Sequence, residues 1–167
     1  MINRGESMQR VVNCILRDKD RVLLLKKPRR GWWVAPGGKM EPAESIMDTL
    51  LREYEEETGL RLENARLCGV FTMCVEDRGG LAKEWMMFTF FADRYRGVPL
   101  KESEEGILAW HPVTSLSRLP AASGDRIFLE RIALRQEFLV GRFVYSPEEE
   151  LLRYTLNGLP GTKEVQP

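Results

Sequence analysis

The sequence has few of the side chains that build most metal and nucleophile centres: it holds one histidine and three cysteines in 167 residues. One histidine excludes a multi-histidine metal site. His111 lies beside a proline at the end of a strand-like segment, so we expect it to pack rather than to act in catalysis. Cys14, Cys68 and Cys74 lie in apolar segments without a C-x-x-C spacing. We expect buried, reduced thiols rather than a disulfide framework or a zinc site.

The sequence also lacks an excess of charge and a long apolar run. The 25 Lys and Arg balance 25 Asp and Glu, so no overall positive field favours long nucleic acid, and any phosphate chemistry must be local. No apolar run approaches the roughly 20 residues of a membrane span, and residues 1–10 lack the apolar core of a signal peptide. We therefore expect a cytoplasmic protein that acts on a small molecule, with no membrane partner.

Strand-like and helix-like segments alternate along the chain. Apolar runs joined by a charged turn predict a hairpin over residues 10–27, and further strand patterns cover residues 65–77, 84–95 and 106–113, which we expect to form a meander. Helical spacing returns over residues 124–139, and two short strands follow over residues 141–156. This order predicts an α+β fold with a mixed sheet between helices, in a single domain of residues 1–156 with a frayed tail of residues 157–167.

The segment 46–58 has the pattern of an amphipathic helix. Ser45 can cap its N-terminus, and Gly59 suits the left-handed conformation at a helix C-terminus. Apolar side chains recur on one face at helical spacing. The members of this stripe are Ile46, Met47, Leu50, Leu51 and Tyr54.

Three acids of this helix share one face. Spacings of three and four residues bring Glu53, Glu56 and Glu57 onto one arc at the edge of the apolar stripe. Most acidic runs are simply solvated helix faces. Here the acids lie in the C-terminal half of the helix, where the helix dipole disfavours negative charge. We expect a hard divalent cation to compensate, and oxygen ligands without histidine or cysteine favour Mg²⁺ or Mn²⁺ over zinc.

A glycine pair precedes the helix. Residues 32–38 (WWVAPGG) look extended, and we expect Pro36, Gly37 and Gly38 to end that extended segment. The glycines allow the backbone to approach closely and to present the Gly37 carbonyl to a metal, while Lys39 adds a positive charge for phosphate. The glycine loop and the acidic helix face are thus predicted to be two sides of one metal and phosphate site.

The spacing of these residues resembles the box of the Nudix hydrolase family. The matching positions are Gly38, Glu44, Arg52, Glu53, Glu56, Glu57, Gly59 and an apolar Leu60. Tyr54 departs mildly from the pattern, because family members more often have an aliphatic residue there. The resemblance implies an α/β/α sandwich.

The resemblance also implies roles for these residues. Mg²⁺ would be bound by Glu53, Glu56 and Glu57 with the Gly37 carbonyl, and Arg52 would pair with Glu44 to hold the loop and the helix together. A water would attack an internal phosphorus of a nucleoside diphosphate linked to a further group. Glu53 is the expected base for that water, and Arg52 is counted with it among the catalytic candidates.

Outside the box, the chain resembles the MutT-like, 8-oxo-dGTP diphosphatase branch of the family. In that branch an acid five residues before a tryptophan completes the metal site, which implies that role for Glu105 before Trp110. Asp125 matches one of the branch's base-reading acids. Two positions depart from the animal-type enzyme: Val34 replaces a base-reading asparagine, and Ser123 replaces a base-stacking tryptophan.

Two adjacent tryptophans are candidates for contacting the substrate. Side chains of neighbouring residues on an extended segment point to opposite faces. At most one of Trp32 and Trp33 therefore faces the ligand, and core packing is the alternative for either. Gly38 and Lys39 are the candidates for the phosphates.

The leading functional hypothesis is a Mg²⁺-dependent (or Mn²⁺-dependent) hydrolase that converts a nucleoside triphosphate, with 8-oxo-dGTP as the named candidate, to the monophosphate and pyrophosphate. Two alternatives stay open. The enzyme could act on another nucleoside diphosphate derivative, namely a nucleotide sugar, a dinucleotide polyphosphate or a capped RNA end. The domain could instead bind nucleotides without turnover, although it keeps an acid at every expected metal position.

Overall fold

The computed structural model describes residues 7–161 and is built on one mixed β-sheet. Its strands are β1 (Gln9–Asp18), β2 (Arg21–Lys26), β3 (Trp33–Val34), β4 (Gly37–Lys39), β6 (Arg66–Asp77), β7 (Gly80–Ala92), β9 (Glu102–Ser103), β10 (Gly106–Pro112), β11 (Leu139–Tyr145), β12 (Leu151–Leu156) and β13 (Leu159–Pro160). The strands pair in the order β13-β12-β11-β6-β7-β1-β2-β10-β9, with β3 on β2 and β4 on β1. A separate small sheet joins β5 (Arg61–Leu62) to β8 (Tyr95–Arg96).

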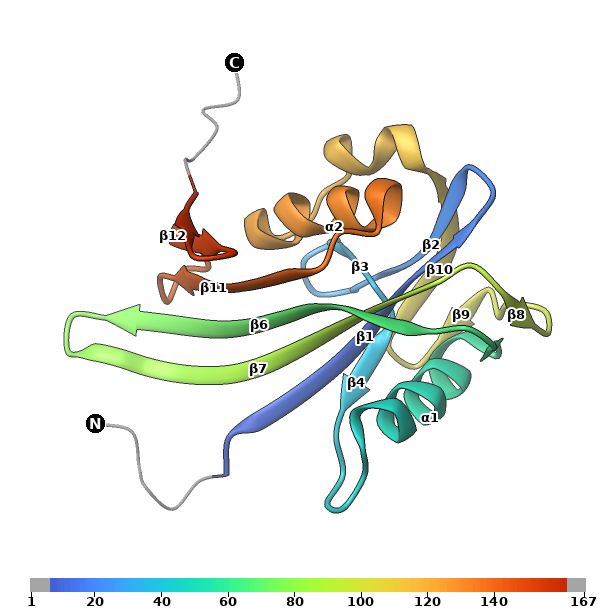
Figure 1. The fold of residues 1–167 in the computed structure, drawn as a ribbon, viewed down its shortest axis with the longest axis horizontal. Helices are drawn as coiled ribbons and strands as arrows, with labels where there is room; N and C mark the ends of the chain where they lie inside the picture. The colour runs from blue at the N-terminus through green and yellow to red at the C-terminus, as the bar shows by residue number, and fades with distance from the viewer. Residues whose placement is uncertain (1–6, 162–167) are drawn as a thin grey trace.

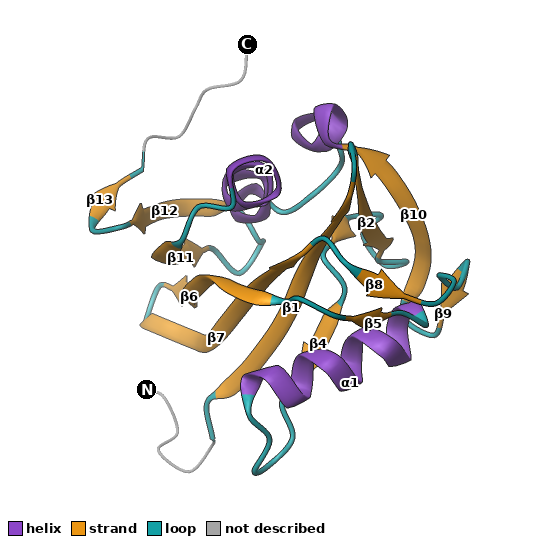
Figure 2. Cartoon of the chain, turned by 45° about the vertical axis from the view of Figure 1, so that its right-hand side comes forward, coloured by secondary structure: helices purple, strands orange, loops and turns teal. Residues whose placement is uncertain are grey.

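Helices cover both faces of the sheet. Helix α1 (Ile46–Thr58) packs on one face, while α2 (Ser123–Arg135) and the 3₁₀ helix η1 (Val113–Arg118) lie on the other (Figures 1 and 2). Strand β1 contributes side chains to both cores, because successive side chains of a strand point to opposite faces of the sheet. Val12 and Cys14 belong to the core under α1, and Ile15 belongs to the core under α2. The predicted α/β/α sandwich with a mixed sheet is confirmed. None of the helices within residues 7–161 is long and apolar enough to cross a membrane.

Helix α1 begins and ends at the predicted residues. The Ser45 hydroxyl accepts from the Asp48 N–H, and the Asp48 carboxylate accepts from the Ser45 N–H, which makes a reciprocal capping box. Gly59 is left-handed with φ 76°, and its N–H donates to the Glu55 carbonyl. The buried stripe is narrower than predicted, because Met47 and Leu51 keep 36% and 41% of their surface exposed, whereas Leu50 and Tyr54 are fully buried.

The predicted hairpins form, but the predicted meander is wrong. Strands β1 and β2, β6 and β7, and β11 and β12 pair antiparallel as expected. Strand β10 pairs with β2 instead of β7. The free edge of β7 is taken by β1, which runs parallel to it over residues 9–16, so β10 must join the sheet elsewhere.

The chain end also differs from the prediction. Leu159 and Pro160, expected to fray, form β13 against β12. Asn157 and Gly158 turn the chain with φ 50° and 79°, the positive angles that a two-residue hairpin turn needs. Residues 162–167 of the predicted tail lie outside the described residues.

The expected packing of the cysteines and the histidine is confirmed. Cys14, Cys68 and Cys74 are free and buried. The His111 and Trp33 rings pack edge to face, with their centroids 4.2 Å apart. Burial lowers the pKa of the His111 imidazole. His111 therefore belongs to the packing between β10 and β3.

The capping box leads to a test of α1 stability. Replacing Ser45 by alanine removes the side chain that satisfies the Asp48 N–H, so we expect Ser45→Ala to lower the free energy of unfolding in urea by about 1 kcal/mol. The control is Ser117→Ala in η1, which changes an exposed serine. An equal loss in both variants would contradict the capping role.

Candidate active site

Gly37 and Gly38 lie in strand β4, which corrects the prediction that they end an extended segment. β4 runs antiparallel to β1, with Gly37 opposite Asn13 and Gly38 opposite Val12. A β-carbon on Gly38 would lie 2.2 Å from the Glu53 carboxylate, and one on Gly37 would lie 2.8 Å from the Asn13 β-carbon. The glycines are therefore required by close approach on both faces of β4, and not by a turn.

Glu57 joins the helix to this strand. Its side chain is buried, and Oε2 accepts a hydrogen bond from the Gly37 N–H at 3.0 Å. Burial raises the pKa of Glu57 to about 7, while the Gly37 N–H and the Lys27 charge act in the opposite direction. Within residues 7–161 Glu57 forms no ion pair, and a bound cation would stabilise a buried carboxylate that has one hydrogen bond.

Arg52 organises the other end of the site. Its Nε and one Nη donate to the two carboxylate oxygens of Glu44 at 2.6 and 2.9 Å. These hydrogen bonds are the main reason that the pKa of Glu44 falls to about 2. The same guanidinium donates to the Lys39 carbonyl at 3.2 Å and to Glu53 Oε1 at 2.7 Å. The expected pairing of Arg52 with Glu44 is present, and it ties the β4–α1 connection to the helix.

The remaining acids are held apart in this structure. The Glu56 side chain is 61% exposed, 3.6 Å from an Arg52 Nη, and the Glu105 carboxylate accepts from the Lys27 ammonium at 3.1 Å. Within residues 7–161, no three histidine, cysteine, aspartate or glutamate side chains gather closely enough to hold a metal ion. The donor set nevertheless fits Mg²⁺ or Mn²⁺, since it consists of carboxylates along one side of α1, one of them buried beside Gly37.

Lys27 is a residue of this site that the sequence analysis did not single out. It belongs to the basic segment 26–30 (KKPRR), for which a solvated loop is the favoured interpretation of the sequence and attraction of a polyphosphate the alternative. Its pairing with Glu105 spans 78 residues of sequence, and its charge acts on the Glu57 carboxyl. The basic segment itself was a signal, but the partner could not be identified before the sheet order was known.

The two tryptophans have different surroundings. Trp33 packs against the core under α2, and the Trp32 ring lies 5.2 Å from the Arg30 guanidinium. Asp125 is in the first turn of α2, where burial raises its pKa to about 7. Trp33 and Asp125 therefore belong to the α2 side of the sheet, whereas the Trp32 carbonyl accepts from the N–H of Lys27, the partner of Glu105, at 2.8 Å.

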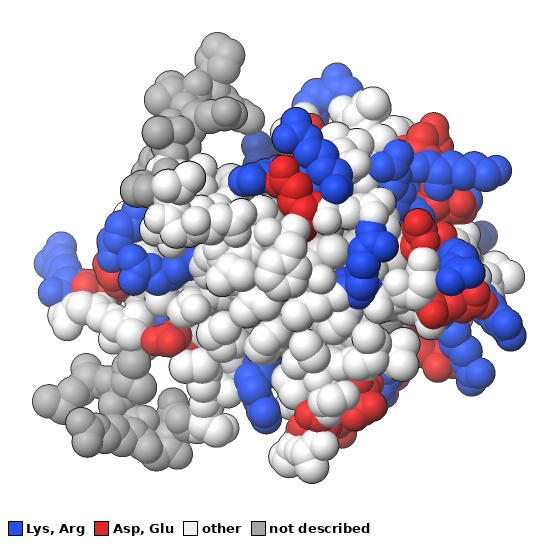
Figure 3. Space-filling view, in the orientation of Figure 1, with Lys and Arg blue, Asp and Glu red and all other residues white. Residues whose placement is uncertain are grey.

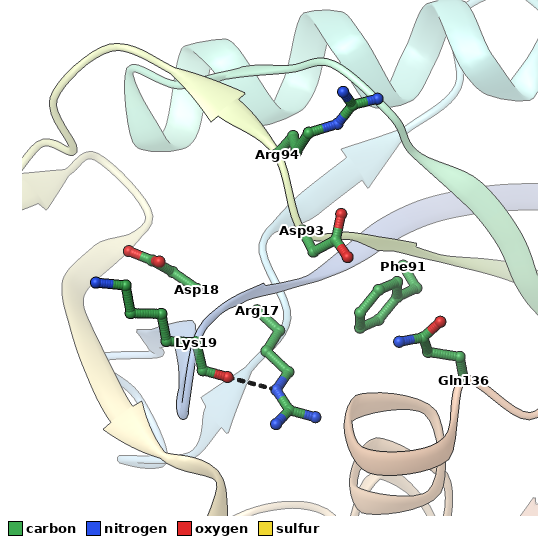
Figure 4. A pocket seen from close by; sticks show the side chains of 7 residues that line it. All are labelled: Arg17, Asp18, Lys19, Phe91, Asp93, Arg94 and Gln136. Carbon is green, nitrogen blue, oxygen red and sulfur yellow. Dashed lines mark hydrogen bonds between the residues drawn. The ribbon is translucent and has the colours of Figure 1, made fainter.

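A hollow on the surface lies away from the candidate site. It measures about 460 Å³ and lies where β1, β7 and the C-terminal end of α2 meet (Figure 4). Its lining residues are Arg17, Asp18, Lys19, Phe91, Asp93, Arg94 and Gln136. Arg17 is tied to the backbone there, since its Nε donates to the Lys19 carbonyl at 2.7 Å. No predicted site residue lines this hollow.

On the face shown in Figure 3, acidic and basic side chains are interspersed, and an uncharged band crosses the middle. That face carries no broad positive area of the kind that binds the backbone of long nucleic acid.

Comparison with known proteins agrees with this geometry. Residues 7–132 match the model of the NUDIX domain family. The uncharacterised Nudix hydrolase YvcI of Bacillus subtilis is 54% identical over 150 residues, covering 90% of this chain and 95% of that protein. The crystal structure of a mutator MutT protein from Bacillus halodurans superposes with a TM-score of 0.88 at 50% identity, covering 92% of this chain and all of that one.

A human relative is longer. The 8-oxo-dGDP phosphatase NUDT18 is 37% identical over 131 residues, which are 74% of this chain but 38% of NUDT18. The chain therefore spans less than half of that protein. The match to the family model includes β4, α1 and the acids of the candidate site. The chain therefore belongs to the Nudix hydrolase family, whose members are enzymes that use divalent metal ions to cleave phosphoanhydride bonds of nucleotides.

Proposed function

We propose that the protein hydrolyses a nucleoside triphosphate to the monophosphate and pyrophosphate, with 8-oxo-dGTP as the leading substrate and Mg²⁺ or Mn²⁺ as the metal. The observation that carries this proposal is the junction of β4 and α1. There the buried Glu57 accepts from the Gly37 N–H, and Glu53 lies directly against Gly38. Acids and a side-chain-free backbone segment meet at one place, as a metal-bound polyphosphate requires.

The metal would be held by oxygen ligands from α1, with one more from the β9–β10 turn. These ligands are Glu53, Glu56, Glu57 and Glu105, joined by the Gly37 carbonyl of β4. When bound, the metal supplies positive charge that offsets the phosphate oxygens and favours ionisation of a water. Glu53 is the residue in our proposal that accepts the proton of the attacking water, because Arg52 fixes its position and the lack of a side chain at Gly38 leaves room for its carboxylate.

Basic side chains near the acids would receive the phosphates. Lys39 is exposed at the end of β4, and Lys27 stands beside Glu105. In the proposal these ammonium groups attract the polyphosphate and offset its charge. Arg52 is committed to Glu44 and Glu53, so it acts by positioning the carboxylates.

The relatives support an oxidised guanine nucleotide and add a second candidate. NUDT18 is described as an 8-oxo-dGDP phosphatase, so a nucleoside diphosphate cleaved to monophosphate and phosphate is the second candidate function. Base contacts are proposed for Asp125 and for one of Trp32 and Trp33. Val34 and Ser123 offer neither the amide nor the indole of the animal-type enzyme, so the base must be read by other residues.

A product assay distinguishes these functions. Purified protein with Mg²⁺, or with Mn²⁺, is incubated with 8-oxo-dGTP, dGTP, 8-oxo-dGDP, ADP-ribose and a dinucleoside tetraphosphate, and phosphate and pyrophosphate are measured separately. We expect pyrophosphate and 8-oxo-dGMP from 8-oxo-dGTP. Phosphate from 8-oxo-dGDP alone would favour the second candidate, and tight nucleotide binding without any product would refute catalysis.

The position of Glu53 gives a mutational test. Glu53→Gln keeps the size of the side chain but removes the base and a metal ligand, so we expect turnover to fall by about 10²-fold or more with an unchanged melting temperature. The matched control is Glu55→Gln on the same helix, since Glu55 points away and pairs with Arg61. If Glu53→Gln turned over as fast as the wild type, the proposed chemistry would be wrong.

The partly buried carboxyl of Asp125 predicts a pH dependence of stability. Its folded-state pKa of about 7 lies above the ordinary value of 3.8, so protonation favours the folded state. The free energy of unfolding should therefore fall as pH rises from about 4 to 7, and Asp125→Asn should lack this part of the fall. Urea unfolding of both proteins without metal at several pH values measures the difference. Glu57 contributes equally to the pH dependence of the wild type and of Asp125→Asn. A difference in free energy of unfolding that stays constant from pH 4 to 7 would therefore contradict the raised pKa of Asp125.

A further inference from the structure

Two buried polar side chains lie next to each other in the middle of the sheet without the partners they need. Asn13 in β1 is 8% exposed, Thr89 in β7 is fully buried, and the two residues are opposite each other in the parallel pairing of these strands. Neither the Asn13 Oδ1 atom nor the Thr89 hydroxyl has a hydrogen-bond partner. The Asn13 Nδ2 atom donates only to the thioether of Met87, at 3.6 Å, and sulfur is a weak acceptor.

Such a pair is hard to explain by stability. Buried polar groups are almost always hydrogen-bonded, and leaving them unpaired costs free energy. Apolar residues of similar size would fill the same space at these positions, as Ile15 and Phe91 do two residues further along the same strands. Violations of local packing rules of this kind are expected at functional sites.

The pair lies just across the sheet from the acids. Gly37 is opposite Asn13 in the β1–β4 pairing, and the Gly37 N–H holds Glu57 on the α1 side. The Asn13 side chain points the other way, toward Met87 in the core under α2. A β-carbon on Gly37 would lie 1.9 Å from the Val12 carbonyl oxygen and 2.8 Å from the Asn13 β-carbon, so the glycine allows β4 to lie close against β1 at Asn13.

We propose that Asn13 and Thr89 form the polar floor of the nucleobase subsite, an inference that rests on the proposed nucleotide hydrolysis. The Asn13 Oδ1 atom accepts from a ring N–H, and the Thr89 hydroxyl donates to the carbonyl next to it. This matches a base edge with adjacent N–H and C=O groups, which guanine and 8-oxoguanine have and adenine lacks. The flexible Met87 side chain covers the Asn13 amide in the free protein and gives way to the base.

The experiment uses two shape-conserving variants, Thr89→Val and Asn13→Leu, and two probes. Calorimetry measures binding of 8-oxo-dGMP, which fills the base subsite, and of pyrophosphate with Mn²⁺, which fills the acidic side alone. We expect each variant to weaken 8-oxo-dGMP binding at least tenfold and to leave pyrophosphate binding unchanged. The urea midpoint of the metal-free variants should be equal to or higher than that of the wild type, since unpaired polar groups have been removed.

A matched control is Thr72→Val in β6. The Thr72 hydroxyl also lies on the sheet and donates to a thioether, Met86 Sδ at 3.5 Å. Its neighbours Phe71 and Met73 belong to the core under α2, so Thr72 points to the opposite face. Both probes should bind this variant as they bind the wild type.

The outcomes separate this inference from the proposed function. Unchanged 8-oxo-dGMP affinity in both variants would overturn it, and so would a lowered urea midpoint with unchanged affinity, which would mark a structural pair. Wild-type protein that binds pyrophosphate with Mn²⁺ but neither 8-oxo-dGMP nor dGMP would also overturn it, with the hydrolytic site left standing. Wild-type protein that binds no pyrophosphate with Mn²⁺ would instead count against the proposed function.

Discussion

The hydrogen bond from the Gly37 N–H to the Glu57 carboxylate is the contact on which the site depends. It can form only because β4 lies within hydrogen-bond reach of α1, and the approach is that close only because residues 37 and 38 have no side chains. The Glu44–Arg52–Glu53 network fixes the other end of the same junction. An acid that would otherwise be costly to bury is thereby held at a defined place beside an accessible strand.

Two cationic side chains, Arg52 and Lys27, offset the repulsion among the carboxylates of the site. Arg52 contacts acids on the β4–α1 connection and on the helix, and Lys27, directly after β2, pairs with Glu105 in the β9–β10 turn. These exposed or partly exposed pairs contribute little to stability by themselves. Their effect is to fix where Glu44, Glu53 and Glu105 lie. Within residues 7–161 no three acids lie close enough to hold a divalent ion in this arrangement, so Glu56 and Glu105 would have to move toward it.

Local signals predicted the parts of the fold that local chemistry decides. The Ser45 cap, the Gly59 end and the three hairpins follow from residues close in sequence, and they are present. The pairing of β10 with β2 was not predictable, because it depends on which edge β1 occupies. Glycines disfavour strands in general, so the extended state of Gly37 and Gly38 follows only from the tight space between β1 and α1. The Asn-Gly turn before β13 was a local signal that the sequence analysis passed over.

Strand β1 faces two ways, since its alternate side chains line the layer under α1 and the layer under α2. Substitutions at the β1 positions that face one core can consequently change that core without changing the packing of the other. A lineage that keeps the glutamates of α1 is free to vary the α2-facing positions of β1, β3 and β7. The same hydrolytic site could in this way be combined with different substrate-binding surfaces. The substrate preference of such an enzyme could be changed by substituting only the β1 side chains that face α2.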